Sequence, residues 1–278
     1  MERNVSMIVP HPARKWQCLN ATTLKLIAVV LMFLDHIHQM FVHVGAPMWL
    51  TMMGRLVFPI FLFTAAESFY YTRSKKKYLQ RLLVASCGMT LFTVILQLIL
   101  PNDHVVLMNN AFSTFFVAVW YMLSWEMLVA GVRHRKTKQI FKAILYGLVP
   151  ILSALPLLFV AELSSHEGVP FVLLKTLITL ALMIPNLLAV EGGAAMVALG
   201  VGFYIFRKHR AVQIALLLML SAVVYLSGDR IQWMMGFAAL PIALYNGERG
   251  KGMKSFFYVF YPLHIGLLYV VSTILCGS

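Results

Sequence analysis

Residues Thr22–Val44 read TTLKLIAVVLMFLDHIHQMFVHV, an apolar run that is long enough to cross a bilayer as one helix. Lys25 lies near the start of the run, where a long side chain can extend to the membrane surface. Asp35 and His36 lie well inside it, and a charge at the centre of a bilayer costs about 2.5–3.5 kcal/mol on insertion scales. The stretch therefore predicts a membrane helix that carries a polar site.

The composition of the whole chain agrees with that first run. Of its 278 residues 60% are hydrophobic and only 12% are charged, whereas a soluble domain carries about 25% charged residues. This excludes a soluble globule, a disordered tail and a fibrous repeat, and the apolar runs are continuous rather than alternating, which excludes a transmembrane β-barrel. We expect an all-α, polytopic transmembrane helical bundle that forms a single domain over residues 1–278, with residues 1–20 as a short cytoplasmic segment.

About ten apolar runs have a length near that of a membrane span. They are Thr22–Val44, Met48–Thr72, Leu82–Leu100, Ala111–Val132, Ile140–Ala161, Pro170–Val190, Gly192–Phe206, Ala211–Ser227, Ile231–Asn246 and Ser255–Cys276. Every connection between them is short, so no soluble domain is inserted.

Basic residues predict the orientation, because short cytoplasmic loops are enriched in Lys and Arg. The clusters are Arg3 to Lys15, Arg73 to Arg81, Arg133 to Lys142, Arg207 to Arg210 and Arg249 to Lys254. In an inner-membrane protein with a cytoplasmic N-terminus, all of these clusters lie on the cytoplasmic side only if Pro170–Val190 and Gly192–Phe206 do not both cross the membrane fully. Pro170–Val190 contains Pro185 and Asn186, which favours a broken segment. We expect nine full crossings, one partial segment and an outer C-terminus; ten plain crossings are the alternative.

The net charge of +13 would be typical of a nucleic-acid-binding protein if the chain were soluble. Here the basic residues lie in short loops between apolar runs, so they are explained by topology, and we expect a membrane-lipid environment and no nucleic-acid partner. Cys18, Cys87 and Cys276 are isolated in sequence, without the spacing of a zinc site. We therefore expect no metal.

Asp35, His36 and Arg55 are predicted to meet in the outer half of the membrane. Arg55 lies in the second run, which follows the first after a tight connection, so the two helices form a hairpin. One interpretation is an Asp35–Arg55 pair that only joins the helices. The other is a catalytic histidine whose basicity and tautomer depend on a carboxylate. His38 lies nearly opposite His36 on the helix and is interpreted as an interface residue.

The loop Arg249–Lys254 contains Gly250 and Gly252, and glycine-rich basic turns allow backbone N–H groups to approach a phosphate.

Motifs at both ends of the chain resemble those of one family of membrane proteins, the TraX family. The N-terminal motif residues are Leu24–Ala28, Met32, Asp35-His36, Gly54–Leu56, Phe58–Phe61, Thr72, Tyr78 and Arg81-Leu82. The C-terminal ones are Gln232-Trp233, Tyr245–Gly247, Arg249-Gly250 and Phe257–His264. Glu191–Gly193 resembles a weaker central motif. The similarity extends over nearly the whole chain.

The resemblance implies an integral membrane acyltransferase that takes an acetyl group from cytoplasmic acetyl-CoA. The family is named after a pilin acetylase and is similar to the acyltransferase-3 group, in which a first-helix histidine is catalytic; its match here is His36, with Asp35 and Arg55 beside it. The acceptor would be a peptide amine or a carbohydrate hydroxyl on the outer side. The residues expected to bind the coenzyme are Arg81, Arg249, Lys251, Tyr78, Tyr261 and His264.

Two other classes of function fit an intramembrane polar site. A transporter or flippase for a small or lipid-linked molecule would also place charges along its path. A structural assembly subunit would use the charges only to join helices. Acetyl transfer by the purified protein distinguishes the first hypothesis from both of these.

Overall fold

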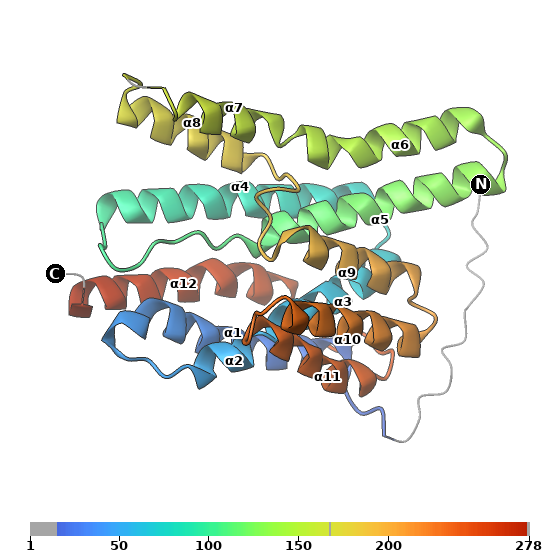
Figure 1. Ribbon diagram of the computed structural model, residues 1–278. Helices are drawn as coiled ribbons and strands as arrows, with labels where there is room; N and C mark the ends of the chain where they lie inside the picture. The colour runs from blue at the N-terminus through green and yellow to red at the C-terminus, as the bar shows by residue number, and fades with distance from the viewer. Residues whose placement is uncertain (1–15, 167, 277–278) are drawn as a thin grey trace.

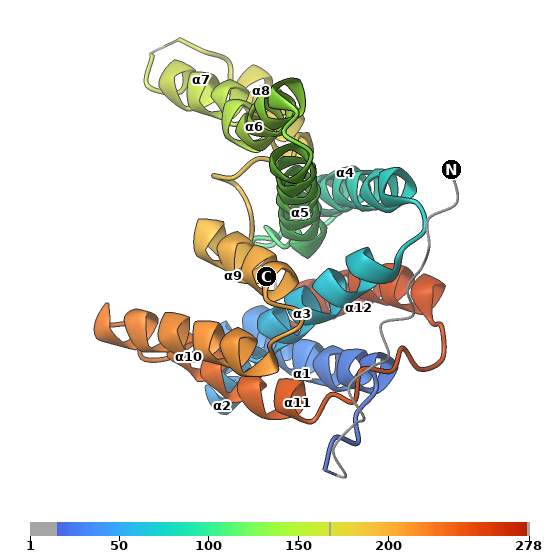
Figure 2. The same cartoon turned by 90° about the vertical axis from the view of Figure 1, so that its right-hand side faces the viewer.

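The computed structural model describes residues 16–166 and 168–276, which form a bundle of helices (Figures 1 and 2). The helices are α1 (Ala21–Phe41), η1 (Val42–Val44), α2 (Trp49–Gly54), α3 (Val57–Tyr71), α4 (Lys75–Ile99), α5 (Ala111–Arg133), α6 (Thr137–Leu152), α7 (Leu155–Leu163), α8 (Phe171–Met183), α9 (Gly193–Ile205), α10 (Arg210–Leu226), η2 (Gln232–Ala238), α11 (Ala239–Ala243) and α12 (Lys254–Cys276). No β-strand occurs in these ranges. The predicted all-α fold class is therefore confirmed. Most of the predicted cytoplasmic segment 1–20, including Arg3, Arg14 and Lys15, lies outside the described residues.

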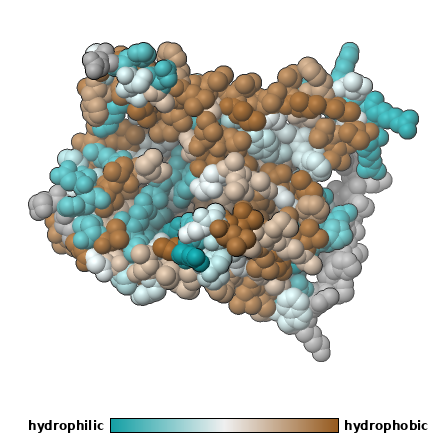
Figure 3. All heavy atoms as spheres, in the orientation of Figure 1, coloured by the Kyte–Doolittle hydropathy of each residue, from teal (hydrophilic) through white to brown (hydrophobic). Residues whose placement is uncertain are grey.

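Within the described ranges, six helical segments are long and apolar enough to cross a membrane. They are Ala21–Val44, Trp49–Tyr71, Lys75–Ile99, Ala111–Arg133, Thr137–Leu163 and Ser255–Leu275. Large apolar side chains remain exposed on the bundle, as with Phe141, which is 62% exposed, and Leu226, which is 82% exposed. Figure 3 shows hydrophobic residues over the layer of α6 and α7, with hydrophilic residues at its two ends. The protein is a membrane protein with transmembrane helices.

The two short helices α8 and α9 together cross the bundle once. Each has 13 residues and is about 20 Å long, shorter than the hydrocarbon core of about 30 Å. They run one after the other in the same direction (Figure 1). In the link between them Asn186 is buried, whereas Ile184 and Leu188 are exposed. The side chain of Asn186 accepts hydrogen bonds from the N–H groups of Leu188 and Ala189 at 3.1 and 2.9 Å, which satisfies backbone groups of this non-helical link. The predicted break is present, but it shortens both runs rather than one.

The basic loops gather at one end of the bundle. The α3–α4, α5–α6 and α9–α10 connections lie on the right in Figure 1, and Figure 2 views the molecule from that end. The helix α12 ends at the opposite side (Figure 1). This arrangement agrees with the alternation of basic and non-basic connections on which the predicted orientation rests.

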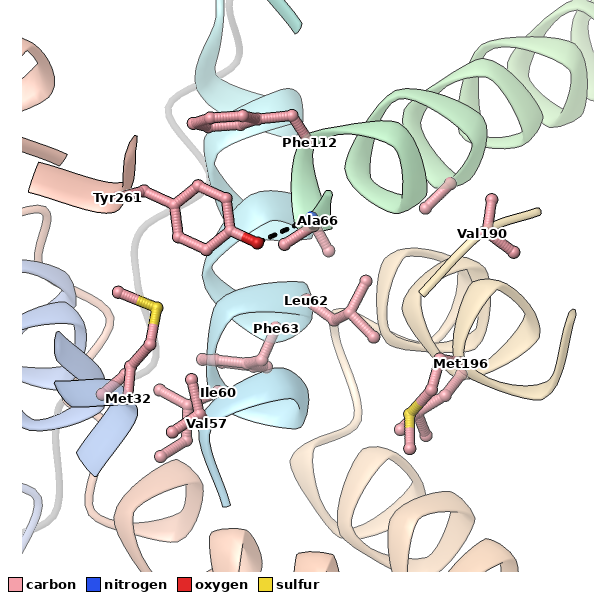
Figure 4. Close-up of a cluster of buried hydrophobic side chains, with 14 of the residues drawn as sticks. Met32, Val57, Ile60, Leu62, Phe63, Ala66, Phe112, Val190, Met196 and Tyr261 are labelled. Carbon is pink, nitrogen blue, oxygen red and sulfur yellow. Dashed lines mark hydrogen bonds between the residues drawn. The ribbon is translucent and has the colours of Figure 1, made fainter. Parts of the chain in front are cut away.

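The core is built around α3. Figure 4 shows Leu62 and Phe63 of α3 between Tyr261 of α12 on one side and Met196 of α9 on the other. Leu62 and Phe63 are completely buried, and the edge of the Phe63 ring meets the ring of Tyr245 with centroids 5.3 Å apart. Packing against α3 positions α1 and α9, and α12 in turn packs against α1 and α4. The helices α1 and α12 carry several of the polar residues described next.

Candidate active site

Arg55 and Asp35 form the predicted ion pair between the first two helical runs. The Arg55 Nη2–H group donates to Asp35 Oδ1 at 2.8 Å, and the Thr51 hydroxyl donates to the same oxygen at 2.7 Å. The neighbouring Gly54 permits this approach, because a Cβ atom there would lie 2.3 Å from Asp35 Cβ. The pair lies at the break between α2 and α3, where the helices are joined by Arg55 and Leu56.

Further hydrogen bonds hold the guanidinium of Arg55 in place. Its Nε–H group donates to the Thr51 carbonyl at 3.1 Å, and its Nη1–H group donates to Gln232 Oε1 at 3.0 Å. Gln232 begins η2, where the backbone N–H groups of Gln232 and Ile231 donate to Asp229 at 2.8 and 3.0 Å. These two bonds lower the pKa of the Asp229 carboxyl below its ordinary value. The guanidinium is therefore a fixed group rather than a mobile one.

The partner of His36 is another histidine, from the far end of the chain. His36 Nδ1 lies 2.6 Å from His264 Nε2, and His264 Nδ1 lies 2.6 Å from the Phe260 carbonyl oxygen. Both imidazoles are buried, with 4% exposure each. A carbonyl oxygen only accepts, so His264 Nδ1 carries the proton, and neutral His264 presents a bare Nε2 to the N–H group of His36.

This chain of bonds determines which nitrogen of His36 is unprotonated. If Nδ1 carries the proton, then Nε2 carries a lone pair that can accept a hydrogen bond or a proton. The Asn109 amide donates toward that nitrogen across 3.4 Å, and it is held by reciprocal bonds with Gln39 of 2.9 and 3.0 Å. A bare imidazole nitrogen can remove a proton or attack a carbonyl carbon.

One cavity of about 1390 Å³ connects this histidine with the basic end of the bundle. Its wall includes Asp35, His36 and Arg55, and also the basic side chains of Arg81, Arg249 and Lys251. Along α1, the distance from Thr22 at one end to His36 is about 21 Å at 1.5 Å per residue. The cavity therefore has a basic mouth and a polar interior, joined by walls that are mostly apolar.

The mouth is shaped by the loop before α12, which folds over the start of α1. The Thr22 hydroxyl lies 2.6 Å from the Lys251 carbonyl and 3.1 Å from the Arg249 carbonyl. Gly250 adopts φ +68°, and a Cβ atom there would lie 2.4 Å from Asn20 Oδ1. Since Asn20 caps α1 by accepting from the N–H group of Thr23 at 2.9 Å, only glycine fits at position 250.

The cavity wall contains most of the residues that the sequence nominated for a site. Tyr78 and Tyr261 line it together with the acidic and basic residues just named. The Tyr261 hydroxyl accepts from the N–H group of Ala111 at 3.1 Å, as Figure 4 shows. His264 differs: it is not part of the wall and lies behind His36. Its proposed role therefore changes from binding a cofactor to positioning His36. Asp35 likewise bonds to Arg55 and Thr51, and the residue bonded to His36 Nδ1 is His264.

His38 and Lys75 are held by contacts of their own. His38 Nδ1 lies 3.1 Å from the carbonyl oxygen of Pro47, in the connection between α1 and α2. Lys75 forms an ion pair with Glu126, which also accepts from the Tyr204 hydroxyl. These contacts account for the positions of both side chains, although His38 also lines the cavity.

Glu191 and Asn109 are among the polar residues of the cavity wall that received no site role from the sequence. Glu191 follows the non-helical link before α9, and its Oε2 accepts from the N–H group of Asn110 at 3.1 Å. Asn109 lies in the extended segment before α5, and both residues line the cavity. Glu191 could have been nominated from its position in an apolar region before two glycines. Asn109 could not have been nominated from the sequence, because the pair Asn109-Asn110 before an apolar run is accounted for by a helix cap. Asn110 is that cap: its side chain accepts from the N–H group of Ser113 at the start of α5, at 3.2 Å.

Comparison with known proteins gives the family. A family model described as TraX protein matches residues 20–272. The chain is also 27% identical over 265 residues to the probable fimbrial assembly protein FimC, serogroup H1, of Dichelobacter nodosus; the match covers 90% of this chain and 94% of that protein. No solved structure matches the chain. The family match spans α1 to α12 and includes every residue of the cavity wall named above, so the chain belongs to the TraX family.

Proposed function

We propose that this protein is a membrane acetyltransferase that moves an acetyl group from acetyl-CoA to an amine or hydroxyl acceptor. The observation that carries the proposal is one cavity whose wall contains both the basic residues of the mouth and His36. In this proposal the basic end faces the cytoplasm, across the inner membrane from the acceptor. The resemblance to membrane acyltransferases supports the same chemistry.

The donor enters the mouth with its phosphates among Arg81, Arg249 and Lys251. Arginine gives planar, paired contacts to phosphate oxygens, and Gly250 brings backbone N–H groups close to the same place. The walls farther in are partly apolar and include Tyr78 and Tyr261. This sequence of surfaces suits a molecule with an anionic head and a thin, less polar arm that ends in the thioester.

The reaction takes place beside His36. The acceptor nitrogen or oxygen attacks the thioester carbonyl carbon, and His36 Nε2 removes the proton from the attacking atom. The carbon–sulfur bond then breaks, the acetyl group stays on the acceptor, and coenzyme A leaves with the proton on its sulfur. Once Nε2 has taken up this proton it no longer accepts from Asn109, and the N–H group released in this way can donate to the carbonyl oxygen of the intermediate. His264 acts as a positioning residue.

For the acceptor we propose a surface-assembled peptide with a free amine, or a sugar hydroxyl. The match with a protein whose name refers to fimbrial assembly favours the peptide. The acceptor approaches from the end opposite the basic mouth, where Gln39, Asn109 and Thr51 line the cavity.

The test uses purified full-length protein with acetyl-CoA and candidate acceptors, and it measures coenzyme A release together with the mass of the acceptor. His36→Ala should lower the rate about 10²–10⁴-fold, the usual contribution of a general base. His38→Ala is the matched control and should have a much smaller effect, because its ring contacts Pro47 instead. Normal transfer by His36→Ala, or an equal loss in both variants, would overturn the assignment.

Transport is the second candidate function, favoured by the broken α8–α9 traverse, because Glu191 and Gly192 at its break line the cavity. Protein in sealed vesicles that carries a labelled substrate across the bilayer without releasing a coenzyme A thiol would support transport and contradict acetyl transfer.

A further inference from the structure

The helices α4 and α12 lie together at one end and diverge toward the basic end. At the far end, the Tyr269 hydroxyl donates to the Leu100 carbonyl at 2.8 Å, and the Asn102 amide donates to Thr273 Oγ1 at 3.0 Å. Phe92 of α4 packs directly against Gly266 of α12, because its ring atom Cζ lies only 2.6 Å from the position that a Cβ atom of Gly266 would occupy. Toward the basic end, Pro262 lies inside α12, where a proline removes a helix hydrogen bond and bends the helix.

The divergence leaves a groove of about 870 Å³ on the outside of the bundle. One side is a continuous stripe of α4 that begins with Lys77 and Arg81 and continues through Val84 and Gly88 to Phe92. The stripe is open to the surroundings, since Val84 is 72% exposed. At Gly88 a Cβ atom would meet nothing within 4 Å, so there is open space beside the middle of the stripe.

The groove has the dimensions of one lipid tail. From Arg81 to Phe92 it extends about 16 Å at 1.5 Å per residue, and one leaflet of a bilayer is about 15 Å deep, half of its core of about 30 Å. It therefore runs from the membrane surface at the basic end to near the bilayer centre, where Phe92 and Gly266 close it.

The charge at the open end selects the headgroup. Lys77 and Arg81 are exposed cations at the point where a lipid headgroup would lie, and Arg81 is anchored beside the ring of Tyr78 at 5.7 Å. Basic pockets between transmembrane helices on this side of a membrane bind anionic headgroups.

We propose that the groove between α4 and α12 is a binding site for an anionic glycerophospholipid, with one acyl chain along Val84 to Phe92 and its phosphate on Lys77, beside Arg81. The groove adjoins the acetyl-transfer cavity, because Lys77, Arg81, Phe112 and Tyr258 belong to the walls of both. The lipid thus supports one wall of the basic mouth from outside, and the proposal does not depend on which reaction the cavity performs.

The test measures bound lipid on the purified full-length protein after delipidation, by native mass spectrometry with added phosphatidylglycerol or phosphatidylcholine. Gly88→Phe fills the groove at its middle, and Gly147→Phe is the matched control: it makes the same change on α6, where a Cβ atom also meets nothing within 4 Å. Bound phosphatidylglycerol should fall about tenfold in Gly88→Phe, which corresponds to about 1.4 kcal/mol, and should stay at the wild-type level in Gly147→Phe.

A headgroup variant tests the charge separately. Lys77→Gln should keep the tail site and lower the preference for phosphatidylglycerol over phosphatidylcholine. If Gly88→Phe does not fold, the lipid preference of Lys77→Gln still tests the proposal. Equal binding of the two lipids by the wild type, or wild-type phosphatidylglycerol binding by a folded Gly88→Phe, would overturn the proposal.

Discussion

Replacing His264 with phenylalanine tests the bond that sets the tautomer of His36. The new ring keeps the aromatic shape, which stacks on Phe260 with centroids 4.6 Å apart, but it has no nitrogen to accept from His36 Nδ1. Leaving a buried donor without a partner costs about 1–3 kcal/mol. His36 avoids this cost by moving its proton to Nε2, which then no longer has the lone pair that the reaction needs.

The size of the effect follows from that cost. Returning His36 to its reactive tautomer requires the same 1–3 kcal/mol or so, and about 1.4 kcal/mol changes a rate tenfold, so kcat should fall about 5–150-fold. The KM for acetyl-CoA should stay unchanged, because His264 is not part of the cavity wall. In the control variant His264→Gln, the side-chain oxygen can accept from Nδ1 and should restore part of the rate.

The assay is coenzyme A release over a range of pH, with the thermal unfolding temperature measured on the same preparations. Unchanged stability together with a lower kcat indicates a positioning role for His264. A stable His264→Phe protein with a kcat within about twofold of the wild type would refute the bond as a determinant of reactivity. A raised KM with normal kcat would return His264 to the coenzyme site.

Three further outcomes are expected from the same structure. Gly54→Ala should lower the unfolding free energy by about 1–3 kcal/mol, seen as a lower unfolding temperature, because its Cβ would lie 2.3 Å from Asp35 Cβ; Gly147→Ala, with open space around it, should be neutral or stabilising. Arg249→Ala should raise the KM for acetyl-CoA with little change in acceptor affinity, and the coenzyme should bind more weakly as salt rises; equal competition by coenzyme A and its dephospho form in both proteins would contradict the phosphate contact. Gly250→Val should lower the unfolding temperature, since its side chain would displace Asn20 from the cap of α1, and an unchanged unfolding temperature would contradict the close contact.

The ion pair of Asp35 and Arg55 could be predicted from the sequence because both residues lie near one tight connection between two long apolar runs. In such a hairpin, counting residues from the turn gives the depth of each side chain at 1.5 Å per residue. The structure confirms the pair at 2.8 Å. That residues of the basic loops line one cavity could also be predicted, because the charge pattern assigns those loops to one side of the membrane.

The break between α8 and α9 was only half predictable. Pro185 and the two glycines after Glu191 indicate that the helix is interrupted, and the charge pattern requires one crossing fewer than the apolar runs suggest. Which of the two runs is incomplete depends on where the non-helical link lies. The bonds of Asn186 to the backbone satisfy N–H groups of that link, and each helix is left with 13 residues.

The sequence by itself determined that this protein is an all-α membrane protein, which loops share a side, and that Asp35, His36 and Arg55 form a polar site. These conclusions follow from hydropathy and charge, which each stretch of chain carries locally. Only the tertiary structure decided that His36 bonds to His264, 228 residues away, and that Asn109 approaches its other nitrogen. Contacts of this kind depend on the rotation and depth of separate segments, which close packing between distant parts of the chain sets and local periodicity does not encode.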